Sequence, residues 1–387
     1  GKGSGIGDFG RGRTGGNHTS VETGPAGYML DHVSGTNCSL NPDHSVTAVV
    51  IANQRTLCTF SNNVSRASLI IVKDAHPQSG QDFTFSYRIG SGTPANFILD
   101  DDGNNANLRS DTRTFSNLLP GNYTVREHNT DNWFLTDIDC VSNLRTLNDL
   151  SNPVTLNLAA GETMTCTFTN EKEGRISAFK YDDITANGHF NFGDIPLMGW
   201  NMQLFRGANC VPGQELGSPH ATNLWGWASF DDLRPGTYSI YETGLFTHPH
   251  WDNVTPACQT VIVQPDDCDT VSFGNFHLTL IDGFKWNDIN GNGHKELGEP
   301  ALSGWMMTLY QYLNGEWQQL AQTTTNEFGY YQFDQVTFGT YRVTEEARSG
   351  WTATNPASGY YDSIEPWSGI PVHKNFLNQM QATVNVI

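Results

Sequence analysis

One stretch of this chain occurs twice. Residues 180–200 read KYDDITANGHFNFGDIPLMGW, and residues 285–305 read KWNDINGNGHKELGEPALSGW. Both copies begin with a lysine, continue through carboxylate and amide side chains around a glycine, and end on a Gly-Trp pair. A repeat with a period of about 100 residues is a duplicated domain, because solenoid units are shorter. The chain is therefore predicted to be a row of similar modules.

The strand signals predict that each module is a β-sandwich. Runs such as SLIIVKD, DFTFSYRI and GTYSIYE are short, alternating or β-branched, and bounded by Gly, Pro, Asn or Asp. Charged residues make up 16% of the 387-residue chain and glycine contributes 39 residues, which favours many strands and turns over long helices. No helical periodicity is present. About seven strands per ~100 residues is typical of a sandwich, so the predicted fold class is all-β.

Charge and missing motifs exclude several classes of function. The formal net charge is -19, which argues against nucleic acid or an anionic membrane as a partner. No apolar run is long enough for a transmembrane segment. The chain contains no G-x-S-x-G, H-E-x-x-H or complete phosphate-loop motif, so we do not expect an enzyme. The glycine-rich start, GKGSGIG, is interpreted as a flexible linker within residues 1–66.

The seven cysteines suggest disulfides and an oxidising, extracellular location. Their spacing lacks the paired C-x-x-C pattern of zinc sites. Five glycosylation sequons also fit a surface glycoprotein. The predicted pairs, each bracketing one strand pair and leaving Cys210 over, are Cys38/Cys58, Cys140/Cys166 and Cys258/Cys268, and the sequons are at Asn17, Asn37, Asn63, Asn122 and Asn253.

Three modules, at residues 67–173, 174–279 and 280–378, share an internal order. Each opens with a strand that carries a lysine, and each later has a Gly turn followed by a tyrosine strand that ends in glutamate. Each closes on a strand with an asparagine. The resulting triplets are Lys73, Glu127 and Asn170; Lys180, Glu242 and Asn275; and Lys285, Glu345 and Asn375.

Residues 1–66 are interpreted as the back half of a fourth module. GNHTSVE aligns with GNYTVRE, which places Glu22 at the position of Glu127, and CTFSN repeats CTFTN, which places Asn62 at the position of Asn170. No lysine-bearing first strand precedes Glu22. Either the chain is a window of a longer protein, or another subunit supplies the missing strands. The tail, residues 379–387, is a linker, the first strand of a further module, or a strand donated to a neighbour in a head-to-tail filament of copies of this chain.

The order of lysine, Y-x-x-x-E and asparagine resembles the collagen-adhesin B-type (Cna-B), or prealbumin-like, domain. Such domains stack in Gram-positive pilins and adhesin stalks, and the resemblance covers about residues 67–378. It implies isopeptide bonds from Lys73 to Asn170, Lys180 to Asn275 and Lys285 to Asn375, assisted by the three glutamates. Burial would give a neutral, nucleophilic amine and a protonated carboxyl. The alternative is that these side chains are exposed, or that the lysines form salt bridges.

The repeated loop predicts calcium sites. Residues 288–299 fit the D-x-[DN]-x-[DN]-G-x5-E loop and resemble the calcium loops of serine-aspartate-repeat adhesin B domains. The earlier copy is weaker, since threonine replaces an amide and aspartate replaces the last glutamate. The alternative is a hydrogen-bonded turn without an ion. The predicted ligands are Asp288, Asn290, Asn292, the His294 carbonyl, Glu296 and Glu299, and in the copy Asp183, Thr185, Asn187, the His189 carbonyl, Asn191 and Asp194.

We therefore expect a non-enzymatic, secreted structural protein, such as a stalk, pilus or filament, stiffened by isopeptides, disulfides and calcium. Trp200 and Trp305 follow the repeated loop at matching positions and are predicted core anchors. A ligand-binding adhesin that recognises a glycan or a protein is the alternative, as is a non-catalytic array of a secreted enzyme. Candidate exposed tryptophans for ligand binding are Trp225, Trp227, Trp251, Trp351 and Trp367.

Overall fold

The computed structural model describes residues 3–8, 15–22, 27–106, 108–244 and 248–381. Within these ranges the chain contains β-strands and no α-helix, so the all-β prediction is confirmed. None of the described segments is a helix that could cross a membrane. Contacts between Cα atoms divide the chain into two units, residues 1–173 and 174–387. Each unit holds two separate hydrophobic cores.

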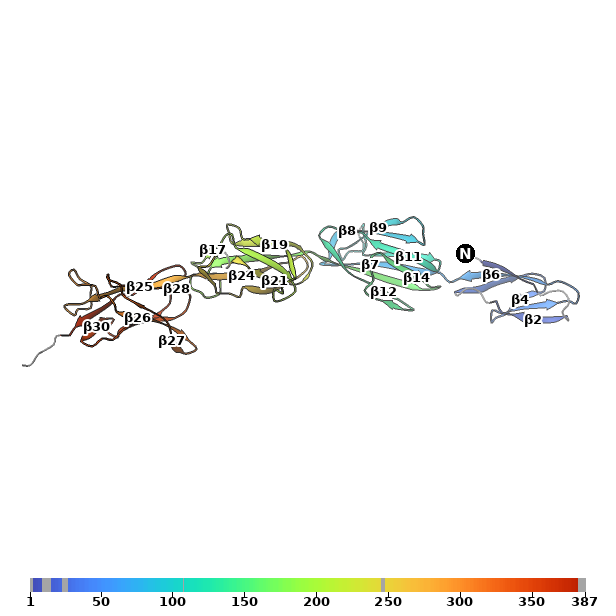
Figure 1. Ribbon diagram of the computed structural model, residues 1–387. Helices are drawn as coiled ribbons and strands as arrows, with labels where there is room; N and C mark the ends of the chain where they lie inside the picture. The colour runs from blue at the N-terminus through green and yellow to red at the C-terminus, as the bar shows by residue number, and fades with distance from the viewer. Residues whose placement is uncertain (1–2, 9–14, 23–26, 107, 245–247, 382–387) are drawn as a thin grey trace, which may run out of the picture. The chain divides into compact units, whose positions relative to one another are not determined.

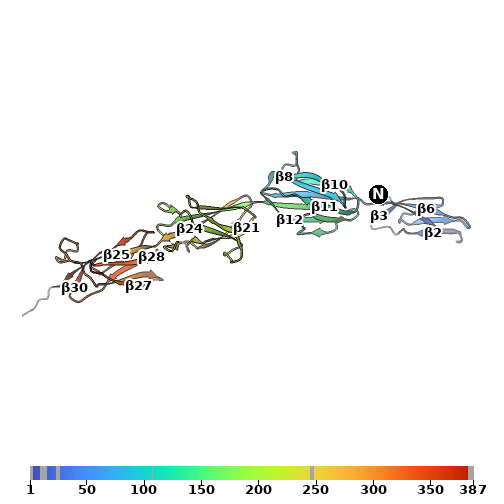
Figure 2. The ribbon, with the colours of Figure 1, turned by 45° about the horizontal axis from the view of Figure 1, so that its top comes forward.

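The module at residues 67–173 is a sandwich of a five-stranded and a four-stranded sheet (Figures 1 and 2). The first sheet has the order β10-β7-β15-β12-β13, and the second has the order β14-β11-β8-β9. All neighbouring strands are antiparallel except β7 and β15, which are the first and last strands of the module and pair in parallel. The strands are β7 (Ala67–His76), β8 (Ser79–Ile89), β9 (Ala95–Asp101), β10 (Thr112–Leu118), β11 (Gly121–Glu127), β12 (Trp133–Ser142), β13 (Thr146–Leu147), β14 (Val154–Leu158) and β15 (Thr163–Lys172).

Strand β7 shows why this sequence forms a sandwich. Its buried and half-buried residues alternate along most of the strand, and the buried face carries Leu69, Ile71 and also Lys73. Successive side chains of a strand point to opposite faces, so a period of two turns one face to the core. The lysine lies on the apolar face, in the same row as leucine and isoleucine. Its position is therefore set by strand periodicity rather than by a loop.

The module at residues 174–279 repeats this pattern (Figure 1). One sheet has the order β17-β16-β24-β22, with β20 also paired to β16, and the other has the order β19-β18-β21-β23. The first strand, β16, pairs in parallel with the last strand, β24. The strands are β16 (Gly174–Asp182), β17 (Ile195–Pro196), β18 (Asn201–Arg206), β19 (Glu215–Ala221), β20 (Trp227–Leu233), β21 (Gly236–Glu242), β22 (Trp251–Asn253), β23 (Cys258–Val263) and β24 (Cys268–His277).

The module that follows has the same two sheets, ordered β28-β25-β33-β30 and β27-β26-β29-β31, with β32 paired to β25. Its first and last strands, β25 and β33, are again parallel neighbours. The strands are β25 (Thr279–Asn287), β26 (Met306–Leu313), β27 (Glu316–Thr324), β28 (Tyr330–Val336), β29 (Tyr341–Glu345), β30 (Trp351–Asn355), β31 (Tyr360–Ile364), β32 (Val372–His373) and β33 (Phe376–Met380). Residues 382–387 of the predicted tail strand lie outside the described residues.

A tyrosine closes the same corner in each of these three modules. Tyr123 donates its hydroxyl hydrogen to the Leu119 carbonyl at 2.7 Å. Tyr238 and Tyr341 make the equivalent bonds, to the carbonyls of Arg234 at 2.8 Å and Thr337 at 3.1 Å. Each tyrosine ring is buried, so its hydroxyl needs a partner within the protein. This bond fixes the start of the strand that ends in Glu127, Glu242 or Glu345.

The N-terminal region forms two three-stranded sheets, ordered β1-β6-β3 and β2-β5-β4. The prediction of a flexible linker at its start is wrong for residues 3–8, because β1 pairs antiparallel with β6 over six residue pairs. An extended glycine-rich segment can still donate and accept ladder hydrogen bonds, which depend on the backbone. The strands are β1 (Gly3–Asp8), β2 (Gly16–Ser20), β3 (Tyr28–Ser34), β4 (Cys38–Leu40), β5 (Val46–Val50) and β6 (Leu57–Val64).

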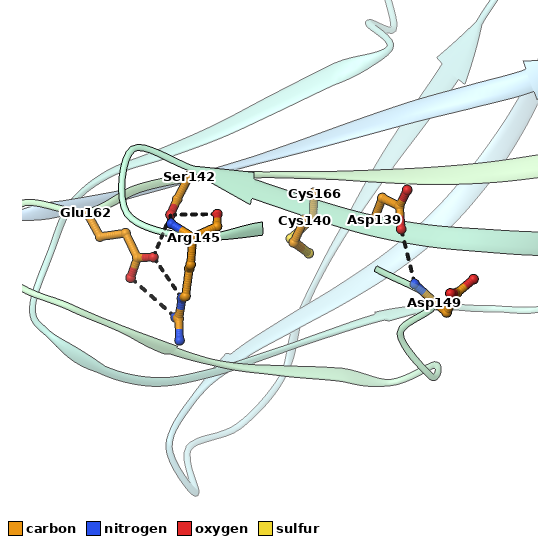
Figure 3. Close-up of a disulfide and its surroundings, with 7 residues drawn as sticks. All are labelled: Asp139, Cys140, Ser142, Arg145, Asp149, Glu162 and Cys166. Atoms are coloured by element: carbon orange, nitrogen blue, oxygen red, sulfur yellow. Dashed lines mark hydrogen bonds and ion pairs between the residues drawn. A yellow bond between two sulfur atoms is a disulfide. The ribbon is translucent and has the colours of Figure 1, made fainter. Parts of the chain in front are cut away.

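Two of the three predicted disulfides are present, Cys38–Cys58 and Cys140–Cys166. Figure 3 shows the second, between directly opposite residues of β12 and β15. Beside it the buried carboxylate of Glu162 accepts hydrogen bonds from Arg145 at 3.0 Å and from the Ser142 hydroxyl at 2.8 Å.

The predicted pair Cys258/Cys268 is wrong, because Cys258 bonds to Cys210 and Cys268 is free. Cys258 begins β23 and Cys268 begins β24, and these strands belong to different sheets. Residues 207–214, after β18, run beside β21 and β23, where the Cys210 amide donates to the Ser239 hydroxyl at 2.9 Å. The Cα atoms of Cys210 and Cys258 are consequently 6.1 Å apart, a normal disulfide separation.

Candidate isopeptide and cation sites

In the module at residues 67–173, the predicted lysine, glutamate and asparagine lie together in the core. Lys73 Nζ donates to Asn170 Oδ1 at 3.1 Å, and Asn170 Nδ2 donates to Glu127 Oε1 at 2.7 Å. All three side chains are at most 2% exposed. Lys73 Nζ also donates to the backbone carbonyls of Asp74 at 2.7 Å and Phe168 at 2.9 Å. The asparagine amide therefore lies between the amine and the carboxyl.

Strand register produces this convergence. Lys73 lies opposite Phe168 in the parallel pair of β7 and β15, and Asn170 lies two residues further along the same face. Glu127 is the last residue of β11 in the facing sheet, and the hydroxyl bond of Tyr123 fixes the start of the same strand. The first strand, the last strand and the facing sheet thus each contribute one member of the triplet.

Each lysine amine is covered by an aromatic ring that meets a second ring edge-on. Lys73 Nζ lies 4.3 Å from the Phe83 ring centroid, and Phe83 packs edge-on against Trp133. In the next two modules the lysines lie over Trp200 at 4.5 Å and Trp305 at 4.9 Å. Trp251 and Trp351 supply the second rings. Trp200 and Trp305, predicted core residues, are each 2% exposed. The sequence does not predict that Trp251 and Trp351 lie at the lysine sites.

Burial shifts the pKa values of the triplet toward the neutral forms. Desolvation lowers the pKa of Lys73 to about 8, although the charges of Glu127 and Asp74 oppose the shift. Desolvation raises the pKa of Glu127 to about 7, against the effect of Lys73 and the Asn170 hydrogen bond. An uncharged amine is the nucleophilic form of lysine, and a protonated carboxyl can act as a general acid. Both species are accessible near neutral pH.

The second triplet is also assembled and buried. Asn275 Nδ2 donates to Glu242 Oε1 at 2.6 Å, and Lys180 Nζ lies 3.6 Å from the same oxygen. Lys180 Nζ donates to the Phe273 carbonyl at 3.1 Å. Desolvation lowers the pKa of Lys180 to about 8 and raises that of Glu242. This geometry differs from that of the first module, because the Glu242 carboxyl lies near both Lys180 Nζ and Asn275 Nδ2.

The third triplet corrects one predicted residue: the buried asparagine is Asn378, not Asn375. Lys285 Nζ donates to Asn378 Oδ1 and forms an ion pair with Glu345 Oε2 at 2.5 Å. Desolvation lowers the pKa of Lys285 to about 8 and raises that of Glu345. Asn375 is exposed and precedes β33, where its side chain accepts a hydrogen bond from the Phe284 amide at 2.9 Å. Its distance from the core follows from its place outside the strand.

A short pattern in the sequence distinguishes the two asparagines. In the first two modules the buried asparagine follows a phenylalanine by two residues, as in Phe168-Thr-Asn170 and Phe273-Gly-Asn275. Phe376-Leu-Asn378 repeats this pattern, and Lys285 lies opposite Phe376 in the parallel pair of β25 and β33. Residues two apart on a strand share a face, so the phenylalanine and the asparagine are buried together.

The loop at residues 288–299 is held by backbone hydrogen bonds to its first and last carboxylates. Asp288 accepts bonds from the amides of Gly291 and Gly293, each at 2.7 Å, and Glu299 accepts bonds from Ile289 at 3.1 Å and Glu296 at 2.9 Å. Burial alone raises the pKa of Asp288, but bonds from Thr354 and the loop amides lower it overall. The carboxylate therefore remains ionised.

The chemistry of this loop fits calcium. The Nδ2 atoms of Asn290 and Asn292 donate to the Glu296 carboxylate at 2.6 and 3.0 Å. The oxygens of these two side chains accept bonds from the backbone amides of Asn292 and His294. Calcium prefers carboxylate, amide and carbonyl oxygens. Among the described residues, no group of three or more His, Cys, Asp or Glu side chains is placed to hold a metal ion. The fit thus depends on the asparagine oxygens.

The copy at residues 183–194 has the same backbone support with a weaker donor set. Asp183 accepts bonds from the amides of Asn187 at 3.0 Å and Gly188 at 2.7 Å, and Asp194 accepts bonds from Ile184 and Asn191. The Asn187 amide donates to the Thr185 hydroxyl at 2.8 Å. This copy offers two carboxylates where the other loop offers three, so we expect lower affinity. The remaining predicted ligands, His189 and His294, would contribute only backbone carbonyls.

Comparison with known proteins supports the assignment of these domains. Residues 279–369 match the SdrD B-like domain family, and residues 69–172 match a prealbumin-like fold domain family. The chain contains tandem prealbumin-like, Cna-B-type domains. The predicted resemblance to Cna-B, or prealbumin-like, domains is confirmed, and the all-β sandwich fold agrees with it.

The related proteins are much longer than this chain. Serine-aspartate repeat-containing protein D of Staphylococcus aureus (strain Newman) is 26% identical over 257 residues, which is 63% of this chain and 19% of that protein. Serine-aspartate repeat-containing protein F of Staphylococcus epidermidis (strain ATCC 12228 / FDA PCI 1200) is 34% identical over 101 residues, which is 26% of this chain and 6% of that protein. The Bacillus anthracis TIE protein overlaps 88% of this chain and 57% of its own, with 16% identity and a TM-score of 0.36. An overlap at that level adds nothing to the assignment.

Proposed function

We propose that this chain is part of an extracellular structural protein, a stalk, pilus or filament, in which each of three modules is closed by a Lys–Asn isopeptide bond. The observation that carries the proposal is the repeated burial of an amine, a carboxyl and a carboxamide in one core. A buried lysine and a buried glutamate are costly unless they are paired or neutralised. Three modules place them at the same register positions.

The condensation uses only groups that are present in each module. The neutral Lys73 Nζ attacks Asn170 Cγ, while Glu127 donates its proton toward the Asn170 amide. The new Nζ–Cγ bond forms, the Cγ–Nδ2 bond breaks, and the proton lost from the lysine returns to the carboxyl. Ammonia leaves, so atoms and charge balance. Fixed proximity replaces a bimolecular encounter and supplies most of the rate.

Mass spectrometry of the intact, disulfide-reduced chain tests this proposal. Each bond releases one ammonia, so three bonds lower the mass by about 51 Da relative to the sequence, or about 17 Da each. Lys73→Met, Lys180→Met and Lys285→Met should each recover about 17 Da beyond the mass change of the substitution. A reduced wild-type chain at full sequence mass would defeat the proposal.

Calcium bound at residues 288–299 would stiffen the loop between β25 and β26. Asp288 and Glu299 would supply carboxylate oxygens, and Asn290, Asn292 and Glu296 further side-chain oxygens, since the two asparagine amides already lie against the Glu296 carboxylate. An ion that binds only the folded chain raises its stability by mass action.

Assembly and location follow from the same proposal. Chains built from cross-linked sandwiches are suited to carry load outside the cell, where the three disulfides can persist. The chain spans about a fifth of the length of serine-aspartate repeat-containing protein D, so the function of the complete protein remains part of the proposal. Copies of this chain are the proposed assembly partners. Electron microscopy of the purified protein distinguishes a filament from single particles.

A ligand-binding adhesin is the second candidate function, and one observation favours it. Leu224 and Trp225, in the turn before β20, are 73% and 74% exposed. Exposed tryptophan is a common platform for sugar rings or protein side chains. Of the other candidate tryptophans, Trp251 and Trp351 are engaged in the cores. Glycan-array binding that is lost in Trp225→Ala but kept in Trp367→Ala would support this function.

A further inference from the structure

Two arginines lie close together on the outer face of the four-stranded sheet in the module at residues 67–173. Val125 is buried, so its neighbours on β11, Thr124 and Arg126, point away from the core. In the antiparallel pair of β8 and β11, both labelled in Figure 1, Arg88 lies opposite Thr124 and Ser86 lies opposite Arg126. Arg88 and Arg126 are therefore diagonal neighbours on the same face, roughly 7–8 Å apart along the sheet.

Neither of these arginines has a carboxylate partner among the described residues. Other arginines of the same module do: Arg145 pairs with Glu162 at 3.0 Å. Arg109 pairs with Asp82 at 3.4 Å. Acidic residues outnumber basic residues in the chain by 40 to 21, so carboxylates are not scarce. Two unpaired like charges on one sheet face repel each other, and an anion bound between them would remove this repulsion.

The two arginines line a hollow of about 320 Å³ on this face. The imidazole of His128 lies within hydrogen-bonding distance of the Ser86 hydroxyl, at 3.2 Å, and Asn96 of β9 lies opposite Ser86 on the other side of β8. A volume of about 300 Å³ is at the small end of the range for ligand sites, so the hollow fits a single ring-sized group. The lining beyond the arginines includes Ser86, Asn96, Thr124, His128, Pro94 and Pro153.

The modules at residues 174–279 and 280–378 do not repeat the arginine pair. Counted from the glutamates that end β21 and β29, the residues at the two positions are Phe205 and Tyr241 in one module and Tyr310 and Thr344 in the other. In the second of these modules Arg342 takes the position of Thr124, and it pairs with Asp362 at 2.7 Å. The sandwich fold thus does not require two unpaired arginines on this face, and the pair points to a ligand instead.

The strands beneath the hollow and its polar lining indicate what kind of anion fits. Strand β8 pairs with both β9 and β11, and β11 pairs with both β8 and β14, so neither offers a free edge to which an extended peptide could add. Guanidinium groups bind a carboxylate through charge-assisted hydrogen bonds. The hydroxyls of Ser86 and Thr124 and the amide of Asn96 can bond to hydroxyl groups. A sugar ring that carries a carboxylate has both kinds of group.

We propose that this hollow binds a carboxylated sugar residue of an acidic polysaccharide. The sugar carboxylate accepts hydrogen bonds from Arg88 and Arg126, and the ring hydroxyls face Ser86, Thr124 and Asn96. Such binding is independent of the isopeptide bonds, because the lysine, glutamate and asparagine of this module lie in the core and the hollow lies on the outer face of the sheet. It would give a structural chain a point of attachment to an anionic glycan.

Titration calorimetry of the whole chain with a tetramer of galacturonic acid tests this site. We expect binding that Arg88→Gln and Arg126→Gln each weaken about tenfold or more, because each variant removes charge-assisted hydrogen bonds to the carboxylate. Arg113→Gln is the matched control. Arg113 is an exposed arginine on β10, in the other sheet of the same module, so this variant removes the same charge and should keep the affinity. The methyl-esterified tetramer, which lacks the charge, should bind more weakly than the acid.

Each of the other outcomes would overturn part of the inference. No binding of the acid tetramer to the wild type, or an equal loss in all three arginine variants, would overturn the site. Equally tight binding of the methyl ester would overturn recognition of the carboxylate. Equally tight binding of a tetraglutamate peptide, or displacement of the tetramer by an equal concentration of inorganic sulfate, would overturn the assignment to a sugar. The mass deficit of about 51 Da is measured on the same sample. If that deficit is present and the tetramer does not bind, this inference fails while the proposed function stands.

Discussion

Glu127→Gln is the most direct test of the chemistry in the first complete module. Glutamine preserves the size of the side chain and can still contact the Asn170 amide, which lies 2.7 Å from Glu127 Oε1. It cannot supply a proton. We expect the variant to fold without the Lys73–Asn170 bond and to show two ammonia losses instead of three.

The cost in stability follows from the loop that this bond closes. Lys73 and Asn170 are 97 residues apart, and a cross-link over a loop of about 100 residues restricts the unfolded chain by about 4.7 kcal/mol. The Cys140–Cys166 disulfide already shortens this loop by its separation of 26 residues, which reduces the value only to about 4.4 kcal/mol, because the dependence on length is logarithmic. At roughly 4–8 °C per kcal/mol for a domain of this size, the melting temperature of the module should fall by roughly 18–35 °C.

Scanning calorimetry of the whole chain, paired with intact-mass measurement, checks both expectations. In Glu127→Gln, only the melting transition of the module at residues 67–173 should shift to a lower temperature. Glu162→Gln is the matched control, because Glu162 is buried in the same module and bonded to Arg145, but it lies outside the triplet. This control should keep all three ammonia losses even if it melts earlier. A Glu127→Gln chain with the full loss of about 51 Da would refute the role of the carboxyl.

Four further predictions test other parts of the structure. Asn378→Ala should restore about 17 Da to the chain mass, whereas Asn375→Ala should leave the mass deficit unchanged, since only Asn378 contacts Lys285. In Asn170→Ala, Lys73 has no side-chain amide to bond to, and its folded-state pKa is about 8, below its ordinary value of 10.5. The unfolded state binds more protons between these values, so urea unfolding should show stability rising by about 2–3 kcal/mol from pH 8 to pH 10.5. If the proposed bond forms, the wild type should lack this rise, because an amide nitrogen does not titrate in this range. Calcium should raise the melting temperature of the module at residues 280–378, and Asp288→Ala should remove this shift, whereas Asp183→Ala should leave it; an unchanged melt in chelator would contradict the site. Denatured, unreduced wild type should contain one reactive thiol and Cys268→Ser none, while a peptide map linking Cys258 to Cys268 would contradict the pairing described above.

Strand periodicity explains why most of the fold could be predicted from the sequence. Alternation identified the lysine-bearing strands, and the repeated Gly-Trp pair identified Trp200 and Trp305 as core residues, both of which the structure bears out. The pairing of first and last strands could not be read from the pattern, because a parallel contact joins segments almost a module apart. The aromatic pair over each lysine depends on that contact and was missed for the same reason.

The errors arose where local spacing was used in place of face and sheet. Asn375 lies in the strand-like segment VHKNF that closes the module, but the face of a strand is set by its neighbours, and Phe376 identifies Asn378 as the buried asparagine. Cys258 and Cys268 are close in sequence, yet the chain crosses from one sheet to the other between them. The glycines of β1 predict a linker because glycine has a low strand propensity. The hydrogen bonds between β1 and β6 require only the backbone, so the segment can still form a strand.

The parallel pairing of first and last strands also determines which residues a pulling force would reach. Tension that enters a cross-linked module at Lys73 would pass directly to Asn170, cross residues 171–179, and enter the next cross-link at Lys180. The segment from Asn275 to Lys285 repeats this step. Residues between each lysine and its asparagine would carry no tension, so each junction could lengthen by no more than the extended span of a short segment, roughly 35 Å at about 3.5 Å per residue. Such a chain would behave as a nearly inextensible tether, because the residues between each lysine and its asparagine would not be stretched.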